Sequence, residues 1–456
     1  MSVGFLSDLL QTIAERGRGV IERAWPSAVG ASERPHTANQ LLALCDALLS
    51  RRGEASGVAI AGAILDGYAM FGEAERIEIL DALERRYGPD ERAVSRAVDA
   101  YQAAPGGDNL KRLQQAVEPR RQELIRRLNL AAHGTAALVK MREDLLRLGK
   151  GEDRWPGLDA DFTHLLASWF NRGFLVMRRI GWSTPANILE LIIRYEAVHE
   201  IRDWDDLRRR IEPDDRRLFG FFHPQLVDEP LIFVEVALTR DIPDSIGALL
   251  TDRRDVIRAR DATTAVFYSI SNCQEGLRGI SFGHFLIKQV ADDLKRELPD
   301  LETFVTLSPI VGAAKWLKAS EDPNDQALAG RASEPDWLGD ATVAERLRPA
   351  MLAAGARYLA QAKRSDGRPI DPVARFHLGN GAVLERVNWP ADRSPGALKS
   401  AFGLMVNYRY DLGAIEQNHE NYAERNEVAI SSAVKRLLTR RPPSPLPAPA
   451  TTGQDA

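Results

Sequence analysis

Hydrophobic positions recur at helical spacing through about the first 180 of the 456 residues. The segment TANQLLALCDALLSRR shows the pattern most clearly, because its apolar residues fall three or four apart and share one face: Leu41, Leu44, Cys45, Leu48 and Leu49. The same spacing continues in AERIEILDALERRYG, in EPRRQELIRRLNLAAHGTAALVKMREDLLRLGKG and in DADFTHLLASWFNRGFLVMRRI, which ends at Ile180. We therefore expect residues 1–180 to form a helical bundle that mediates contacts between subunits.

The pattern changes in residues 181–440, where short apolar runs rich in β-branched residues alternate with helical segments. Five such runs predict strands, namely 230–238, 262–271, 302–312, 382–389 and 403–410. Strands interrupted by helices are typical of an α/β domain. The tail 441–456, RPPSPLPAPATTGQDA, is rich in proline and small polar residues, and we expect it to be disordered.

One segment, CQEGLRGISFGHFLIK, joins a predicted strand to a predicted helix through a loop that contains Gly276, Gly279 and Gly283. Glycines at such a junction let backbone N–H groups converge on an anion. Neither GxGxxG nor GxxxxGK[ST] is present. The form Q-x-G-x-x-G-x-x-x-G instead resembles the pyrophosphate loop of the N-acetyltransferase-like fold, which binds coenzyme A. A glycine-rich turn with only a folding role is the alternative.

Composition narrows the functional class. The net charge of −4 argues against a nucleic-acid-binding protein, and no apolar run approaches the roughly 18 residues that span a membrane. The N-terminus lacks the apolar core of a secretory signal, and its acidic residues argue against a mitochondrial transit peptide. Two distant cysteines fit a reducing compartment and exclude a disulfide scaffold. We expect a cytoplasmic protein.

Three longer stretches resemble the malonyl-CoA decarboxylase family in their sequences and in their order along the chain, namely 219–239, 267–312 and 376–410. Examples are FYSISNCQEGLRG, TLSPI, FHLGNG and NYRY. The resemblance implies an N-terminal all-helical domain that makes homo-oligomer contacts, giving a dimer or tetramer. It implies a following N-acetyltransferase-like α/β domain with a central mixed sheet. The implied reaction converts malonyl-CoA to acetyl-CoA and CO2 without a metal or prosthetic group, coenzyme A being part of the substrate.

The resemblance places the catalytic serine at Ser308 of TLSPI and the catalytic histidine at His377 of FHLGN. Decarboxylation of a malonyl thioester leaves an enolate, which needs hydrogen-bond donors and then a proton at the α-carbon. We hypothesise that His377 delivers this proton and that Ser308 holds the malonyl group. His377 is expected to follow a loop and to precede a strand. The division of roles between the two side chains stays open at the level of sequence.

The same resemblance predicts the residues that bind the substrate. The loop would wrap the pyrophosphate or pantetheine part of the substrate with these residues: Arg278, Gly279, Ile280, Ser281, Phe282, Gly283 and His284. Many family members carry an acidic residue where Ser281 stands, so any role of that acidic side chain is absent here. Ser269 is expected to line the acyl site, and Tyr410 is expected to close it.

Two other functions remain compatible with the sequence. An N-acyltransferase would keep the fold and move an acyl group from coenzyme A to an amine, leaving malonyl-CoA intact. A non-enzymatic protein would use the helical half as a scaffold and the other half as a regulatory module that binds coenzyme A without turnover. Neither alternative involves nucleic acid or a membrane.

Overall fold

The computed structural model describes residues 35–50, 54–152, 154–226, 228–251, 253–280 and 286–439. The N-terminal amphipathic segment and the proline-rich tail, on which the localisation and disorder predictions rest, lie outside these ranges. The chain divides into two compact units. The first comprises the residues up to Val176 together with 221–231 and 273–282, and the second comprises 177–220, 232–272 and the residues from Gly283 onward.

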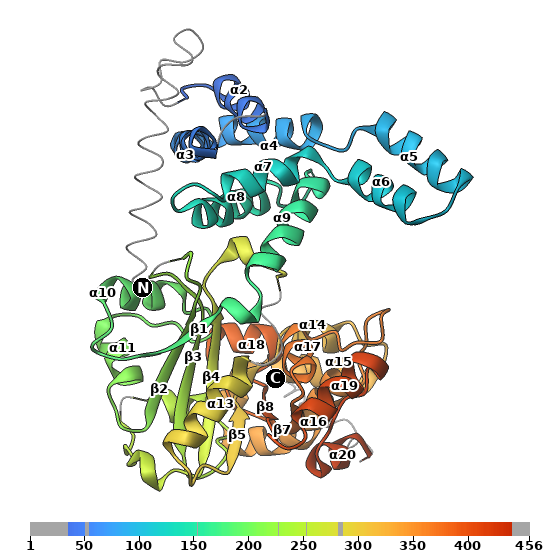
Figure 1. Cartoon of the computed structure of the whole chain (residues 1–456). Helices are drawn as coiled ribbons and strands as arrows, with labels where there is room; N and C mark the ends of the chain where they lie inside the picture. The colour runs from blue at the N-terminus through green and yellow to red at the C-terminus, as the bar shows by residue number, and fades with distance from the viewer. Residues whose placement is uncertain are drawn as a thin grey trace, which may run out of the picture. The chain divides into compact units, whose positions relative to one another are not determined.

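The first unit is built from helices, as the spacing of hydrophobic residues predicts. They are α2 (Ala38–Leu49), α3 (Glu54–Met70), α4 (Glu73–Arg86), α5 (Glu91–Ala103), α6 (Gly107–Val117), α7 (Arg120–Leu128), α8 (Gly134–Leu148) and α9 (Pro156–Trp169). In α2, Leu41, Cys45 and Leu48 of the predicted stripe are buried. Helices α5 and α6 form a hairpin in which no residue is fully buried (Figure 1).

The predicted final helix of this region is too long. Helix α9 ends at Trp169, and the short helix η1 (Arg172–Phe174) leads into strand β1 (Val176–Ile180). The side chain of Asn171 accepts a hydrogen bond from the Gly173 amide at 3.0 Å, which favours a turn over another helical residue.

An eight-stranded mixed sheet follows in the described part of the chain. Its strands after β1 are β2 (Arg216–Phe222), β3 (Pro230–Thr239), β4 (Thr264–Asn272), β5 (Thr303–Thr306), β6 (Ser308–Pro309), β7 (Val383–Asn388) and β8 (Met405–Arg409). The order is β1-β2-β3-β4-β5-β8-β6, and β7 pairs with β8. Strands β3 and β4 are antiparallel, whereas β4 and β5 are parallel. The predicted fold class, a helical region followed by a domain with a mixed sheet, is confirmed.

Helices connect and cover these strands (Figure 1). They are α10 (Ala186–Tyr195), α11 (Trp204–Ile211), α12 (Ile246–Leu250), α13 (Leu286–Glu297), α14 (Ala313–Lys318), α15 (Pro323–Ser333), α16 (Ala341–Ala360), α17 (Pro372–Gly379), α18 (Pro395–Ala401), α19 (Ile415–Arg425) and α20 (Ser432–Thr439). Three more short helices are η2 (Ala259–Asp261), η3 (Glu275–Leu277) and η4 (Pro335–Leu338). Within the described ranges no helix is both long and apolar enough to cross a bilayer.

Strand β4 carries a bulge that shapes the sheet. Glu235 of β3 faces Ser269, but the next residue, Val236, faces Phe267, so Tyr268 is the extra residue. Strand β4 pairs with β5 only over Thr264–Phe267 and then continues to Asn272 beside β3. The chain after Thr306 pairs with β8 instead. The two strands therefore part at the middle of the sheet and leave an opening.

Candidate active site

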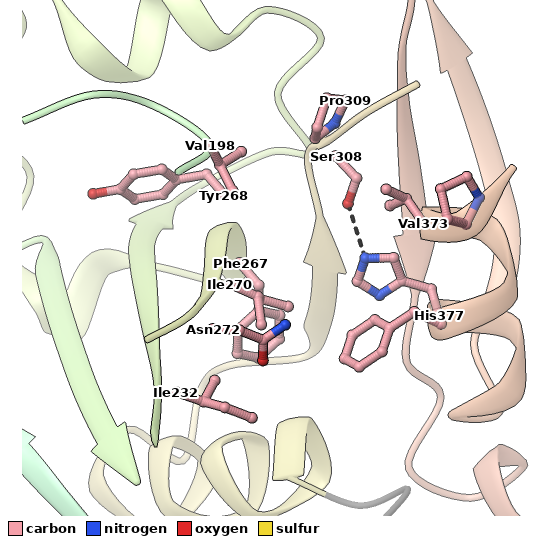
Figure 2. A pocket seen from close by; sticks show the side chains of 12 residues that line it. Val198, Ile232, Phe267, Tyr268, Ile270, Asn272, Ser308, Pro309, Val373 and His377 are labelled. Carbon is pink, nitrogen blue, oxygen red and sulfur yellow. Dashed lines mark hydrogen bonds between the residues drawn. The ribbon is translucent and has the colours of Figure 1, made fainter. Parts of the chain in front are cut away.

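A cleft of about 260 Å³ occupies the opening where β4 and β5 part (Figure 2). Its wall is formed by the residues Val198, Ile232, Phe267, Tyr268, Ile270, Asn272, Ser308, Pro309, Pro372, Val373, Phe376 and His377. This volume lies just below the range of about 300 to 1,000 Å³ that is typical of ligand pockets. None of the lining residues is an aspartate, glutamate, lysine or arginine, so the wall is largely apolar with a few convergent polar groups.

Ser308 and His377 meet in this cleft. Ser308 begins β6 and is buried, and its Oγ lies 3.1 Å from Nε2 of His377 (Figure 2). His377 is not placed after a loop, as the sequence suggests, but lies in the last turn of helix α17. Asp371 caps this helix and Pro372 opens it. The helix carries the imidazole to a strand that is 69 positions away in sequence.

Hydrogen bonds on both sides of the imidazole assign its tautomer. Ser308 donates its hydroxyl proton to Thr306 Oγ1 at 2.8 Å, so its oxygen accepts from Nε2–H of His377. Nδ1 therefore carries no proton and accepts from the Tyr410 hydroxyl at 2.7 Å. Tyr408 stacks on the imidazole with ring centroids 4.6 Å apart. The result is a neutral imidazole whose Nε2–H points at Ser308.

Burial reinforces this neutral state. His377 is buried, and desolvation lowers its pKa from 6.5 to about 3. Desolvation also raises the pKa of the Tyr410 phenol well above its usual value, so Tyr410 keeps the proton that it donates. Tyr410 does not line the cleft, although the sequence predicts that it closes the acyl site. It instead orients the imidazole from behind.

Asp371 ties the serine-bearing segment to the histidine-bearing helix. One carboxylate oxygen accepts from the Ala374 amide at 2.7 Å, and the other accepts from the Val311 amide at 2.8 Å. The side chain is fully buried, and burial raises its pKa. Val311 lies three residues after Ser308, so this single carboxylate fixes the spacing between both catalytic candidates.

Ser269 does not line the cleft, although strand β4 does. Its hydroxyl lies 2.8 Å and 2.7 Å from the two carboxylate oxygens of Glu196, and Ser271 donates to the same carboxylate. Side chains alternate between the two faces of a strand, so Ser269 faces away from the cleft that its neighbours Tyr268 and Ile270 line.

The glycine loop follows Asn272 directly, and its glycines serve different purposes. A Cβ on Gly276 would lie 2.0 Å from the Val139 carbonyl oxygen, so this glycine permits close contact with helix α8. Gly279 adopts φ of +82°, which favours glycine. Arg278 is exposed and lies 3.6 Å from Glu275, whereas Ile280 is buried. The predicted binding residues Ser281, Phe282, Gly283 and His284 lie outside the described residues.

Four further residues of the site have no role predicted from the sequence, namely Thr306, Tyr408, Asn272 and Asp371. A signal existed for the first two, because Thr306 and Tyr408 each lie two residues before a named candidate, Ser308 or Tyr410. Side chains two apart on a strand share a face. Asp371 precedes a proline, which is a common way to begin a helix. Asn272 has no comparable signal.

The described residues offer no cluster of metal-ligating side chains. Among the described residues, no group of three or more histidine, cysteine, aspartate or glutamate side chains is arranged to hold one. Both cysteines, Cys45 and Cys273, are buried thiols.

Comparison with known proteins adds independent information. Residues 173–446 match the model of the malonyl-CoA decarboxylase C-terminal domain, and residues 87–170 match that of the N-terminal domain. The mitochondrial malonyl-CoA decarboxylase of Anser anser anser is 33% identical over 408 residues, which cover 80% of each protein. Its counterpart from Rattus norvegicus is 33% identical over 413 residues, covering 80% of this chain and 82% of that protein.

Solved structures agree with these matches. The crystal structure of malonyl-CoA decarboxylase from Rhodopseudomonas palustris is 56% identical and superposes with a TM-score of 0.84. That from Agrobacterium vitis is 53% identical, with a TM-score of 0.83. Each comparison covers 88% of this chain and 100% of the solved one.

Proposed function

Because the chain belongs to the malonyl-CoA decarboxylase family, we propose that its cleft between β4 and β6 converts malonyl-CoA to acetyl-CoA and CO2. The observation that carries the proposal is the contact between Ser308 and His377 in a cleft whose described lining residues include no aspartate, glutamate, lysine or arginine. The sequence resemblance predicts membership of this family, and the matches to the family models and to the relatives confirm the membership.

An uncharged cleft favours loss of CO2. A malonyl carboxylate that enters it leaves water and meets no lysine or arginine among the lining residues that the structure describes. The bond from the carboxylate carbon to the α-carbon then breaks, CO2 departs, and the electron pair stays on the α-carbon and thioester oxygen as an enolate. The charge becomes more dispersed in this step, which an apolar environment favours. In the proposal, the Ser308 hydroxyl turns from Thr306 when substrate binds and donates its hydrogen bond to the malonyl group.

The proton that completes acetyl-CoA comes from His377 in this scheme. The reaction consumes one proton for each CO2 that is released. The imidazole is neutral in the empty cleft, but the negative charge of bound malonyl-CoA favours its protonated form. The enzyme therefore takes up a proton with the substrate. Nε2 delivers it to the α-carbon, while the Tyr410 oxygen accepts from Nδ1–H and keeps the ring in place.

The coenzyme A part of the substrate is assigned to the glycine loop. Backbone N–H groups there bind the pyrophosphate, and Gly279 with its positive φ shapes the turn. The scheme needs no metal and no prosthetic group, because the thioester itself accepts the electron pair.

The direct test is incubation of the purified protein with malonyl-CoA and excess EDTA, with acetyl-CoA followed by mass spectrometry. We expect stoichiometric acetyl-CoA and CO2. Replacement His377→Asn should lower turnover by about 10²- to 10⁴-fold, the usual contribution of a positioned acid. His164→Asn, at an exposed position on α9, is the control and should keep full activity.

Three results would contradict the proposal. Tight binding of malonyl-CoA without acetyl-CoA formation would mean that the reaction is wrong, and transfer of the acyl group to an added amine would favour the acyltransferase alternative. Activity that EDTA abolishes and a divalent cation restores would refute metal independence.

A further inference from the structure

Arg142, in the middle of helix α8, is buried against the glycine loop. Only 4% of its side chain is exposed. One guanidinium nitrogen, Nη1, donates to the carbonyl oxygens of Gly276 at 2.8 Å and Arg278 at 3.0 Å. Both carbonyls belong to the loop that follows β4, and Arg142 lies more than 130 residues earlier in the chain. A side chain of the helical region therefore holds the backbone of the loop.

The guanidinium is itself fixed by the neighbouring helix α9. Its Nε donates to Asp159 at 2.9 Å, and its Nη2 donates to the Thr163 hydroxyl at 3.0 Å. The planar group thus has partners on three sides, and its orientation is determined by two helices. A lysine at this position would place a single nitrogen where three separate donors are used.

Gly276 permits this approach. A Cβ at Gly276 would lie 2.0 Å from the Val139 carbonyl oxygen on α8, a distance that no side chain can accept. The loop backbone therefore lies directly against the helix, within reach of Arg142. The role of this glycine is contact with the helix and does not require an anion.

The hydrogen bonds from Arg142 to the two carbonyl oxygens also set the direction in which the loop N–H groups point. In a planar trans peptide the C=O and the following N–H point in opposite directions. Because the Arg278 carbonyl points to Arg142, the Gly279 N–H points away from the guanidinium. An amide oriented in this way can donate to an anion on the opposite side of the loop, as nests of backbone N–H groups do.

We propose that Arg142 is a positioning residue for coenzyme A recognition, which orients the loop peptide so that its amide faces the phosphate groups of the substrate. The inference rests on the proposed function, in which the loop binds the phosphate part of malonyl-CoA. It makes the helical region a contributor to substrate affinity, in addition to any role in subunit contacts.

Two substrates separate this role from a general structural one. Malonyl-CoA carries the phosphates, whereas malonyl-pantetheine carries the same reacting group without them. Arg142→Met should raise the KM for malonyl-CoA about ten- to hundredfold, as expected for displaced binding groups, and change kcat by less than about threefold. Its kcat/KM for malonyl-pantetheine should equal that of the wild type.

Matched variants act as controls. Arg142→Lys keeps the charge and should still raise KM, because one ammonium group cannot replace the three nitrogen donors of the guanidinium. Arg121→Lys alters another buried arginine of the same unit, which bonds to Asp161 and to the Glu84 carbonyl, and should lower the melting temperature without changing KM. Thr163→Val removes one support of the guanidinium, so it tests the proposal if Arg142→Met fails to fold, and should raise KM by a smaller factor.

The outcomes discriminate clearly. Equal losses with malonyl-CoA and malonyl-pantetheine in the folded Arg142 or Thr163 variants would overturn the inference, and so would an unchanged KM for malonyl-CoA. If the wild-type protein fails to decarboxylate malonyl-CoA, the proposed function fails first. Calorimetric titration with free coenzyme A then still tests Arg142, and equal Kd values for wild type and variants would reject its role.

Discussion

His377 is neutral in the empty cleft because it is buried, and the same burial makes the stability of the fold depend on pH. In the unfolded chain a histidine has a pKa of about 6.5. In the folded protein desolvation lowers the pKa of His377 to about 3. Between these two values the unfolded state binds a proton that the folded state does not, so acidification destabilises the native protein.

We expect His377→Asn to remove this contribution. Between pH 7 and pH 5 the wild type should lose about 2 kcal/mol of unfolding free energy through His377 alone, since the linkage approaches ~1.4 kcal/mol for each pH unit below 6.5. Asparagine does not titrate, so the variant should lose less stability over the same interval. Thermal melts of both proteins at pH 7 and pH 5 measure the difference. Equal losses would mean that the imidazole is already protonated in the folded state.

For single residues, the sequence predicts which side chains form the site better than it predicts how they are arranged. Ser308 and His377 are found through the stretches TLSPI and FHLGN, and the structure brings them to 3.1 Å. Their catalytic roles stay a prediction. The environment that decides the pKa of His377 arises from burial and from Tyr410, and both depend on long-range packing that spacing along the chain does not reveal.

Among the elements, helix α17 and strand β6 depend on each other through Asp371. Its carboxylate caps α17 at the Ala374 amide and also accepts from the Val311 amide after β6. Asp371→Ala removes both bonds at once. A lost helix cap costs about 0.5–2 kcal/mol, and a shift of the imidazole relative to Ser308 lowers the rate as well.

We therefore expect Asp371→Ala to lower both the melting temperature and kcat, the latter about ten- to hundredfold. Asp340→Ala is the matched control. Asp340 caps α16 through the amides of Thr342 and Val343, so its loss should lower the melting temperature and leave kcat unchanged. Equal kcat values for both variants would show that Asp371 only stabilises the fold.

Apolar runs in the sequence predict most of the strands but not all of them. All five predicted strands exist, with 302–312 divided into β5 and β6. Strand β2 was not predicted, because it begins with Arg216 and Arg217, which mask its apolar residues. Arg217 is nevertheless buried, and its guanidinium pairs with Glu297 at 2.7 Å. The burial of Arg217 depends on this partner 80 residues later in the chain, so local hydrophobicity cannot indicate it.

In the whole molecule, the spacing of hydrophobic residues changes near residue 180, and this change predicts the division into a helical region and a sheet domain. The subunit contacts of the helical region stay a prediction. The α5–α6 hairpin is a candidate for them, because Leu110 and Val117 are 43% and 45% exposed. What the pattern does not predict is that residues 221–231 and 273–282, although distant in sequence, join the compact unit of the helices.

The described residues that line the cleft include no lysine or arginine that would favour malonyl-CoA over the acetyl-CoA that the reaction releases. Product and substrate share the coenzyme A moiety, and the product lacks the carboxylate whose removal from water is costly. Acetyl-CoA should therefore compete with malonyl-CoA, with an inhibition constant no more than about tenfold above the KM, because the product keeps the coenzyme A contacts and avoids the cost of burying a carboxylate. Initial rates at several acetyl-CoA concentrations measure it, and a constant a hundredfold above the KM would contradict this expectation. The protein would then respond to the ratio of the two thioesters, slowing as its own product accumulates.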